Sequence, residues 1–367
     1  MFIKEKQIQY ENYLKSLKKE DKIALMYHAD ADGIASAVIM AKTIELLRGK
    51  PVDHPFSQGR AYAISDETWN FLKAGKYNKF IIVDLAADSQ EKLIKNIEEF
   101  ADILIVDHHE FSIDLSSNKT TFINVFNTTE KKGAAYPASK FIYDLSFNLT
   151  NIENLDWVVS AGIIGDVGFN YWKDFINNTL KKYNERITDH GPDNIFGKIT
   201  SLINASRICN PEGIQECYEI VYNAKSYNDV ISDTKLLGYK IAVTEEINHW
   251  VDEFKKLKGD KGLFVYTIHP KLNINSTLST ILSMDYIPRD STLVVIADNG
   301  EAIVSISARR QDSKSKMNEL LQLAIKDIPN SNAGGHIPAA GGSIPKEYIT
   351  KFKNNLIRVY NEHNGVI

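Results

Sequence analysis

The chain has 367 residues, 43% of them hydrophobic, and a formal net charge of −4, so it is long enough to bury two cores and two domains are expected. Two cysteines are too few for a disulfide scaffold, and no stretch reaches the roughly 18 apolar residues of a membrane helix. The slightly acidic balance argues against a protein that coats duplex DNA, and we expect a soluble, cytoplasmic protein without a membrane partner.

The first predicted elements are a helix and a strand that ends in a polar turn. Residues 1–20 predict an amphipathic helix, and residues 22–27 predict a strand that runs directly into His28, Asp30 and Asp32. These three side chains alternate along the chain, so an extended segment would point them in the same direction. The alternative is a polar turn in which Asp32 caps the apolar helix that follows.

Two further apolar runs end in groups that can bind a metal ion. Residues 80–83 predict a strand that ends at Asp84, although a lone aspartate at this place is also typical of a turn or a helix cap. Residues 103–106 predict another buried strand. It is followed by three polar groups, Asp107, His108 and His109. Ligands of open α/β sheets bind beyond the carboxyl ends of the strands, so we expect these groups to meet there.

The fourth apolar run, residues 158–165, is followed by Asp166. Its small and apolar residues fit a buried strand or a buried helix equally well, so Asp166 joins the candidate site by its pattern alone. Residues 21–167 as a whole alternate strands and helices, which indicates a parallel sheet covered on both faces.

The second half of the chain begins with a helical connector and returns to strands. Residues 171–255 are polar and mostly helical, and a long helix is predicted for residues 233–258. Three strands are predicted at residues 262–268, 292–297 and 302–307. The turn sequence at residues 298–300 predicts a hairpin between the last two of these strands.

The collected metal-binding candidates form a large set of acids and imidazoles. They are His28, Asp30, Asp32, Asp84, Asp107, His108, His109 and Asp166. So many acids in one crevice would repel each other unless cations are bound. Carboxylates and imidazoles without thiolates suit manganese, magnesium, iron or cobalt better than a structural zinc ion. The set exceeds the needs of one ion, and two ions that share a carboxylate are typical of phosphoryl transfer.

These motifs, in this order, resemble those of the DHH phosphoesterases. The matching segments are His28–Gly33, Asp84, Asp107–His109 and Gly165–Gly168. Downstream, Gly334, Gly335 and His336, followed by the small residues 339–342, resemble the glycine-rich signature of the DHH-associated domain, where the glycines form a loop that exposes backbone N–H groups. The resemblance extends from about residue 20 to about residue 345.

A further segment narrows the resemblance to the RecJ-like exonucleases, in their compact archaeal form. Asn204 and Arg207 lie in a segment that is similar to the RecJ connector, and the spacing from His28 to Asp30 is also RecJ-like. The resemblance implies an α/β fold. A parallel-sheet DHH domain (residues 1–190) and a smaller α/β DHH-associated domain (259–367) are joined by a helical connector (191–258), with a cleft between the domains.

The resemblance also implies roles for the candidate residues. One ion is bound by His28, Asp30 and Asp84, and the other by Asp32, Asp84, His108 and Asp166. His109 orients the phosphate or protonates the leaving oxygen. Asp107 does not bind an ion itself but fixes the tautomer and orientation of a histidine. The strand is held by Asn204, Arg207, Arg309, Gly334, Gly335 and His336. We expect two divalent ions, manganese first and magnesium or cobalt as alternatives.

The implied function is metal-dependent phosphodiester hydrolysis, with single-stranded DNA or RNA degraded from an end during DNA repair or replication. One alternative is a nano-RNase or small-nucleotide phosphoesterase that acts on short oligoribonucleotides, cyclic dinucleotides or phosphoadenosine phosphate. Another, from a different class, is a replisome-associated scaffold, and a replisome or repair protein is an expected partner. The sequence leaves open the polarity, DNA against RNA, the native metal and the oligomeric state.

Overall fold

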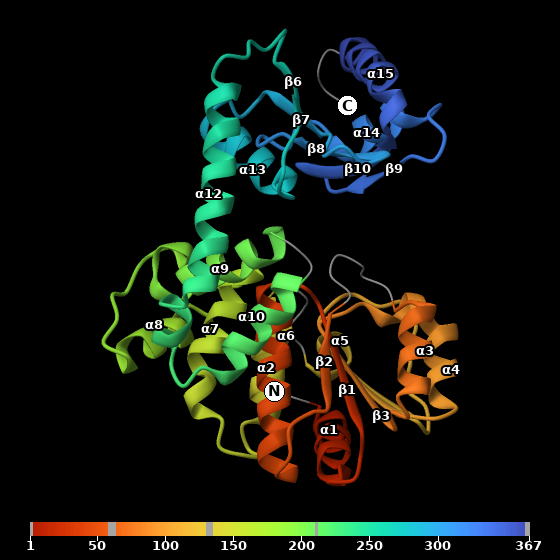
Figure 1. The fold of residues 1–367 in the computed structure, drawn as a ribbon, viewed down its shortest axis with the longest axis vertical. Helices are drawn as coiled ribbons and strands as arrows, with labels where there is room; N and C mark the ends of the chain where they lie inside the picture. Colours follow the sequence, from red (N-terminus) through yellow and green to blue (C-terminus); the bar gives the residue numbers. More distant parts are fainter. Residues whose placement is uncertain (1–2, 58–63, 130–134, 210–211, 364–367) are drawn as a thin grey trace. The chain divides into compact units, whose positions relative to one another are not determined.

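The computed structural model describes residues 3–57, 64–129, 135–209 and 212–363 (Figure 1). The chain forms two compact units, Met1–Lys240 and Ile241–Ile367. The division between them falls within the long helix α12 (Thr234–Phe254), so each unit is described by itself. The three-part division predicted from the sequence, with limits at 190/191 and 258/259, stays a prediction.

The first unit contains a parallel sheet with strand order β2-β1-β3-β4-β5. Its strands are β1 (Ile23–Tyr27), β2 (His54–Phe56), β3 (Lys79–Val83), β4 (Asp102–Asp107) and β5 (Thr120–Asn124). The sequence predicted β1, β3 and β4 within one residue at each end, because these strands are continuous apolar runs. It did not predict the edge strands β2 and β5, which are short or more polar.

Helices surround this sheet. They are α1 (Lys4–Ser16), α2 (Ala31–Arg48), α3 (Asp66–Ala74), α4 (Glu91–Glu98), α5 (Val125–Thr128), α6 (Ala138–Ser146), α7 (Asp156–Gly165), α8 (Lys173–Lys182), α9 (Ile195–Cys209), α10 (Glu212–Asn223) and α11 (Tyr227–Ile231). Figure 1 shows α3 and α4 on one side of the sheet and α2, α6 and α7 on the other. The predicted layered arrangement is confirmed.

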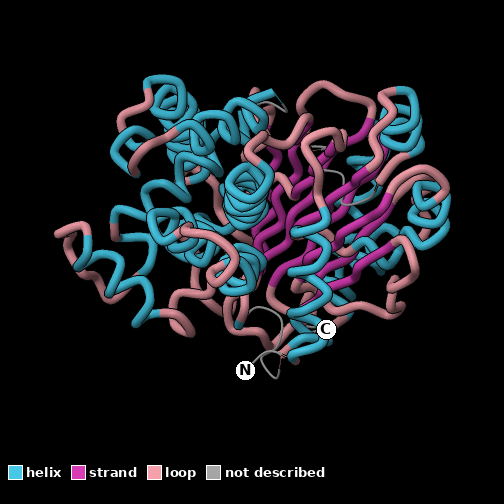
Figure 2. The backbone as a smooth tube through the Cα atoms, turned by 90° about the horizontal axis from the view of Figure 1, so that it is seen from below, coloured by secondary structure: helices cyan, strands magenta, loops and turns pink. Residues whose placement is uncertain are grey.

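Both faces of the sheet are buried because alternate residues of each strand enter different cores. Ile81 and Val83 of β3 pack with α2, α6 and α7, whereas Phe80 and Ile82 of the same strand pack with α3 and α4. This alternation is the direct consequence of the two-residue period of a strand. Figure 2 shows the strands in magenta and the helices in cyan.

The second unit contains a mixed sheet with strand order β6-β7-β8-β10-β9. Its elements are β6 (Leu263–Ile268), α13 (Asn275–Asp285), β7 (Thr292–Ala297), β8 (Ile303–Arg309), α14 (Met317–Ile325), β9 (Asn332–Gly335), β10 (Ala339–Pro345) and α15 (Ile349–Glu362). Only β6 and β7 are parallel. The predicted hairpin turn is present, because Asp298 accepts a hydrogen bond from Gly300 N (3.0 Å), whose φ is +91°.

Within the described residues, no helix is both long and apolar enough to cross a membrane. Both cysteines, Cys209 and Cys217, are free thiols.

Candidate metal centre

The candidate ligands gather where parallel strands end. His28 follows β1, Asp84 follows β3, and Asp107 is the last residue of β4. Because β1, β3 and β4 are parallel neighbours, their carboxyl ends lie at one edge of the sheet. Asp166 reaches the same place from the C-terminal end of α7, so the fourth apolar run is a helix and not a strand.

His28 and Asp30 form the first part of the site. The His28 Nδ1 atom lies 2.9 Å from Asp30 Oδ2 and 3.7 Å from Asp84 Oδ2. Asp30 is also the N-cap of α2, since its Oδ1 accepts a hydrogen bond from Gly33 N (2.9 Å). A Cβ on Gly33 would collide with the backbone carbonyl of His28, so only glycine allows this close approach.

Asp84 lies between the two histidines of the site. Its Oδ1 is 3.2 Å from His108 Nε2, and its Oδ2 faces His28, so each oxygen has a different imidazole. The carboxylate is buried, and the residue has the left-handed conformation (φ +58°), which its N–H bond to Val106 O (3.0 Å) helps to hold. Strained backbone of this kind is common at functional sites.

Asp32 does not have the surroundings that the sequence predicted. Helix α2 begins at Ala31, so Asp32 lies in the first helical turn. The prediction of an extended segment that points His28, Asp30 and Asp32 in the same direction is therefore wrong. Nor does Asp32 cap its own helix, because Asp30 does so. Asp32 accepts hydrogen bonds from Ala138 N (2.7 Å), Ser139 N (3.1 Å) and the Ser139 hydroxyl, all at the start of α6.

His108 and Asp166 face each other without a hydrogen bond. The His108 Nδ1 and Asp166 Oδ2 atoms are 3.6 Å apart. Both atoms are buried, and within the described part of the chain neither has a hydrogen-bond partner. Buried polar atoms almost always have a partner, so this pair fits the demands of a bound cation. The Asp166 carboxylate can come this close to His108 because Gly165, the preceding residue, has no side chain and lets the end of α7 pack against Ala31 of α2.

The ionisation of the free protein also indicates a need for cations. Burial raises the pKa of Asp32 well above its usual value, and repulsion by Asp84 adds to this. Burial likewise raises the pKa of Asp166 to about 6. Burial would lower the pKa of the histidines, but hydrogen bonds to Asp30 and Asp84 raise that of His28 to about 11, and the bond to Asp84 raises that of His108 to about 10.

Protons on the imidazoles therefore balance part of the carboxylate charge. Burial would raise the pKa of Asp84, but its bonds to His108 and His28 outweigh burial and lower it. Binding of a divalent cation would release these protons and leave neutral imidazoles as ligands.

Three overlapping groups of atoms fit the demands of a metal ion. Within each group, the potential ligand atoms lie within 4.8 Å of one another. The groups are His28 with Asp30 and Asp84, Asp32 with His108 and Asp166, and Asp84 with His108 and His109. Oxygen and imidazole donors of this kind suit a hard or borderline divalent ion, and the unpartnered pair at His108 and Asp166 fits a bound cation.

His109 and Asp107 form a pair beside this cluster. The His109 Nδ1 atom lies 2.8 Å from Asp107 Oδ1, and Asp107 is buried whereas 40% of the His109 side chain is exposed. Burial would lower the pKa of His109, but Asp107 raises it. Asn124, the register partner of Asp107 on β5, donates to the His109 carbonyl (3.0 Å). Asp107 thus fixes one ring nitrogen and leaves the other available.

The remaining predicted residues lie elsewhere. Asn204 and Arg207 occupy partly exposed positions of α9, and neither side chain has a hydrogen bond within the described residues. Gly334 and Gly335 belong to strand β9, which pairs with β10, so the predicted glycine loop is wrong at these two positions. His336 begins the turn after β9, with its N–H bonded to Ala339 O (2.8 Å) and its side chain exposed.

Arg309 ends β8 in the second unit. Its guanidinium donates to Ser276 Oγ (3.0 Å) and to the backbone oxygens of Ala308 (3.0 Å) and Ala340 (3.4 Å). Burial lowers its pKa, and no carboxylate pairs with it among the described residues. The next residue, Arg310, is buried and paired with Asp312 (2.8 Å).

Ser139 is the residue that sequence reasoning missed. A serine at the second position of a helix has no signature of its own, because its partner, Asp32, is 107 residues away.

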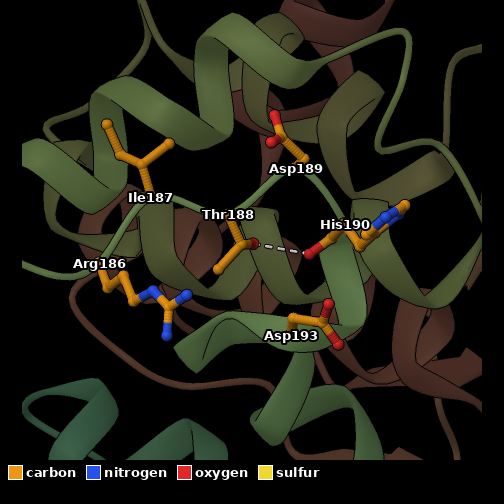
Figure 3. Close-up of a pocket in the computed structure, with 6 residues that line it drawn as sticks. All are labelled: Arg186, Ile187, Thr188, Asp189, His190 and Asp193. Carbon is orange, nitrogen blue, oxygen red and sulfur yellow. Dashed lines mark hydrogen bonds between the residues drawn. The ribbon is translucent and has the colours of Figure 1, made fainter.

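A separate pocket of about 430 Å³ lies in the segment between α8 and α9 (Figure 3). It is lined by Arg186, Ile187, Thr188, Asp189, His190 and Asp193, and the Thr188 hydroxyl donates to His190 O (2.6 Å). None of these residues belongs to the metal cluster.

Comparison with known families gives one match in each half of the chain. Residues 22–163 match the model of the DHH family, N-terminal domain, and residues 245–362 match the DHHA1 domain. A comparison with curated proteins gives no match.

Among solved structures, exonuclease RecJ bound to manganese has a TM-score of 0.71 at 14% identity, with 98% of this chain and 95% of that chain covered. RecJ from Thermus thermophilus in complex with Mn²⁺ has a TM-score of 0.70 at 13% identity, with 98% and 55% covered. CDC45 from Entamoeba histolytica has a TM-score of 0.61 at 10% identity, with 97% and 99% covered. At these identities the likeness is one of fold.

Proposed function

Because this chain belongs to the DHH superfamily and has a RecJ-like fold, we propose that it is a metal-dependent phosphodiesterase that degrades single-stranded DNA or RNA from an end. We further propose a role in DNA repair or replication. The observation that carries the proposal is that His108 Nδ1 and Asp166 Oδ2, which are buried and face each other, have no hydrogen bond within the described residues. Buried polar atoms without a hydrogen bond are uncommon, and two of them facing each other within a group of potential ligand atoms support a bound cation.

Two divalent ions are proposed, with Asp84 shared between them. One would be held by His28, Asp30 and Asp84, and the other by Asp32, Asp84, His108 and Asp166. The two oxygens of Asp84 face different histidines, which supports a shared carboxylate. When bound, such a pair supplies Lewis acidity for the activation of water and positive charge next to the phosphate. Manganese is our first choice, and the RecJ structures with manganese support it.

His109 is proposed to act on the substrate. Asp107 holds its Nδ1, so the ring is fixed and Nε2 is the nitrogen available to donate to a phosphate or to a leaving oxygen. The half-exposed position of this imidazole, next to a buried cluster, supports that role. His109 also lies near enough to Asp84 and His108 to be a further ligand, and metal titration of a His109→Ala variant would separate the two roles.

The strand itself is proposed to be held by Asn204, Arg207, Arg309, Gly334, Gly335 and His336. Arg309 has the strongest support, because a half-buried guanidinium with no carboxylate partner among the described residues is suited to a phosphate. With a net charge of −4, the chain would rely on a few such contacts for one strand.

The deciding test is digestion of end-labelled single-stranded DNA and RNA of several lengths, with and without Mn²⁺. We expect metal-dependent shortening from one end, and the Asp84→Asn variant should lose more than about 100-fold in rate, since loss of an outer-shell partner alone costs about 10–100-fold. Asparagine is chosen because it tolerates the left-handed conformation of Asp84. Asp156→Asn is the control, since Asp156 is also buried but lies outside the cluster, bound to Lys182 and Tyr183.

The products of this assay also separate the alternatives. Hydrolysis confined to dinucleotides, cyclic dinucleotides or phosphoadenosine phosphate would replace the exonuclease with a small-substrate phosphoesterase. No metal-dependent hydrolysis of any substrate, with Asp84→Asn equal to the wild type, would contradict the proposal and leave a scaffold role.

A further inference from the structure

Helix α6 has no capping side chain of its own. It begins after Pro137, which has no side chain able to accept a hydrogen bond. The first N–H groups are satisfied instead by Asp32, whose Oδ2 accepts from Ala138 N (2.7 Å) and whose Oδ1 accepts from Ser139 N (3.1 Å). The Ser139 hydroxyl donates to Oδ1 as well. One metal-site carboxylate therefore accepts three hydrogen bonds from a single helical turn.

Ser139 itself has no freedom to turn away. It is fully buried, and a Cβ on Gly162 of α7 would collide with its Oγ and Cβ. Ala35 of α2 lies beside the same point. Gly162 has no side chain, and the serine hydroxyl fills the narrow space that this provides. The space lies between α2, which carries Asp32, and α7, which ends directly before Asp166.

The start of α6 is also fixed to the loop that follows Asp166. Trp172 Nε1 donates to Ala135 O (2.8 Å). The Lys140 ammonium lies 4.3 Å from the centre of the Trp172 ring and forms an ion pair with Asp144. Tyr136 donates to the same Asp144 (2.5 Å). The turn that holds Asp32 is therefore itself held by hydrogen bonds, an ion pair and a cation–π contact.

We propose that Ser139 is a positioning residue: it orients Asp32 toward the metal ion that Asp32 would bind together with His108 and Asp166. This inference rests on the proposed function. Two of the three donors occupy Oδ1 and one occupies Oδ2, so the acceptor site that remains for a cation shared with His108 and Asp166 is on Oδ2. Groups that orient a ligand from behind are worth about 10–100-fold in metal affinity.

The competing explanation is a purely structural one, in which the bond only caps α6. Capping would affect the free energy of unfolding, whereas positioning would affect one metal ion and not the other. The group of His28, Asp30 and Asp84 has no hydrogen bond from Ser139, so it provides an internal reference.

The test is calorimetric titration of the full chain with Mn²⁺, without substrate. For Ser139→Ala, we expect one of two binding events to weaken about 10–100-fold and the other to stay unchanged. Ser160→Ala is the matched control, because Ser160 is also fully buried but its hydroxyl donates to a backbone oxygen, Asp156 O (2.8 Å), and to no metal-site carboxylate among the described residues. In an Asp32→Asn background, Ser139→Ala should have no further effect.

Each other outcome has a distinct meaning. Wild-type affinity for both ions in Ser139→Ala would overturn the positioning role and leave the proposed function intact. Equal weakening of both events, with Ser160→Ala doing the same, would show a general loss of stability and also overturn it. A wild-type protein that binds no Mn²⁺ would overturn the proposed metal centre itself, and with it the role of Ser139.

Discussion

Val167 is the residue with the least favourable backbone in this part of the fold. It has φ +58°, immediately after Asp166, and its side chain is 85% exposed. A β-branched residue is rare in the left-handed region, and its exposure means that no packing offsets the strain. Val167 directly follows the proposed metal ligand Asp166. Asp84, another proposed ligand, also has a left-handed backbone.

Replacement of Val167 by asparagine should stabilise the protein. We expect Val167→Asn to raise the free energy of unfolding by about 1 kcal/mol, because asparagine adopts the left-handed conformation at lower cost. The reverse change at Asn184, which is exposed with φ +57°, is the control and should lower stability by a similar amount. Urea denaturation of both variants measures this. A less stable Val167→Asn protein would contradict the strain argument.

Arg309 is the residue at which substrate binding can be separated from metal binding. Lysine keeps the charge but loses the parallel N–H groups, so Arg309→Lys should raise the KM for a single-stranded oligonucleotide at least about tenfold. Its Mn²⁺ affinity should not change, because Arg309 lies outside the described metal cluster. Arg358→Lys, on α15 and paired with Glu362 (3.2 Å), is the control. An unchanged KM would remove Arg309 from the substrate site.

At the scale of elements, the site depends on how closely α7 approaches α2. Helix α2 carries Asp32, and helix α7 ends directly before Asp166. Gly162 and Gly165 of α7 lie where the two helices meet. A Cβ on Gly165 would lie 2.6 Å from Ala31 Cβ, which is closer than real side chains come. The small residues of this apolar run therefore allow α7 to pack closely against α2. This packing also sets the distance between the Asp32 and Asp166 carboxylates.

The corresponding prediction is that Gly165→Ala forces the two helices apart. We expect a loss of about 1–3 kcal/mol in the free energy of unfolding from overpacking, together with weaker Mn²⁺ binding. Gly238→Ala in α12 is the control, since nothing lies within 4 Å of a Cβ there. This control should gain about 0.5–1 kcal/mol from helix propensity. Unfolding by urea and a Mn²⁺ titration test both variants, and intact metal affinity in Gly165→Ala would show that the approach of α7 is not needed.

At the scale of the whole molecule, all proposed metal ligands belong to the first compact unit, Met1–Lys240. Metal binding should therefore stabilise this unit and leave Ile241–Ile367 unchanged. Each Mn²⁺ ion at 100 times its dissociation constant contributes about 2.7 kcal/mol, which corresponds to roughly 5–10 °C per ion for a unit of this size.

Differential scanning calorimetry with Mn²⁺ and with a chelator measures this effect. We expect one metal-dependent and one metal-independent transition, and a much smaller shift in Asp84→Asn. Equal shifts of both transitions would mean that the metal also binds in the second unit.

The sequence by itself determined the parallel sheet, the order of its motifs and the candidate ligands. It could do so because buried parallel strands are continuous apolar runs, and because strands that run in one direction end at one edge. The pairing of Asp107 with His109 is likewise a local contact between residues two positions apart.

Only the tertiary structure decided how the remaining groups are used. It made residues 156–165 a helix, it put Gly334 and Gly335 in a strand, and it attached Asp32 to the start of α6. Each of these depends on contacts between residues far apart in the chain, which local periodicity does not contain. The same holds for the two oxygens of Asp84, since their orientation toward His28 and His108 follows from the packing of three strands.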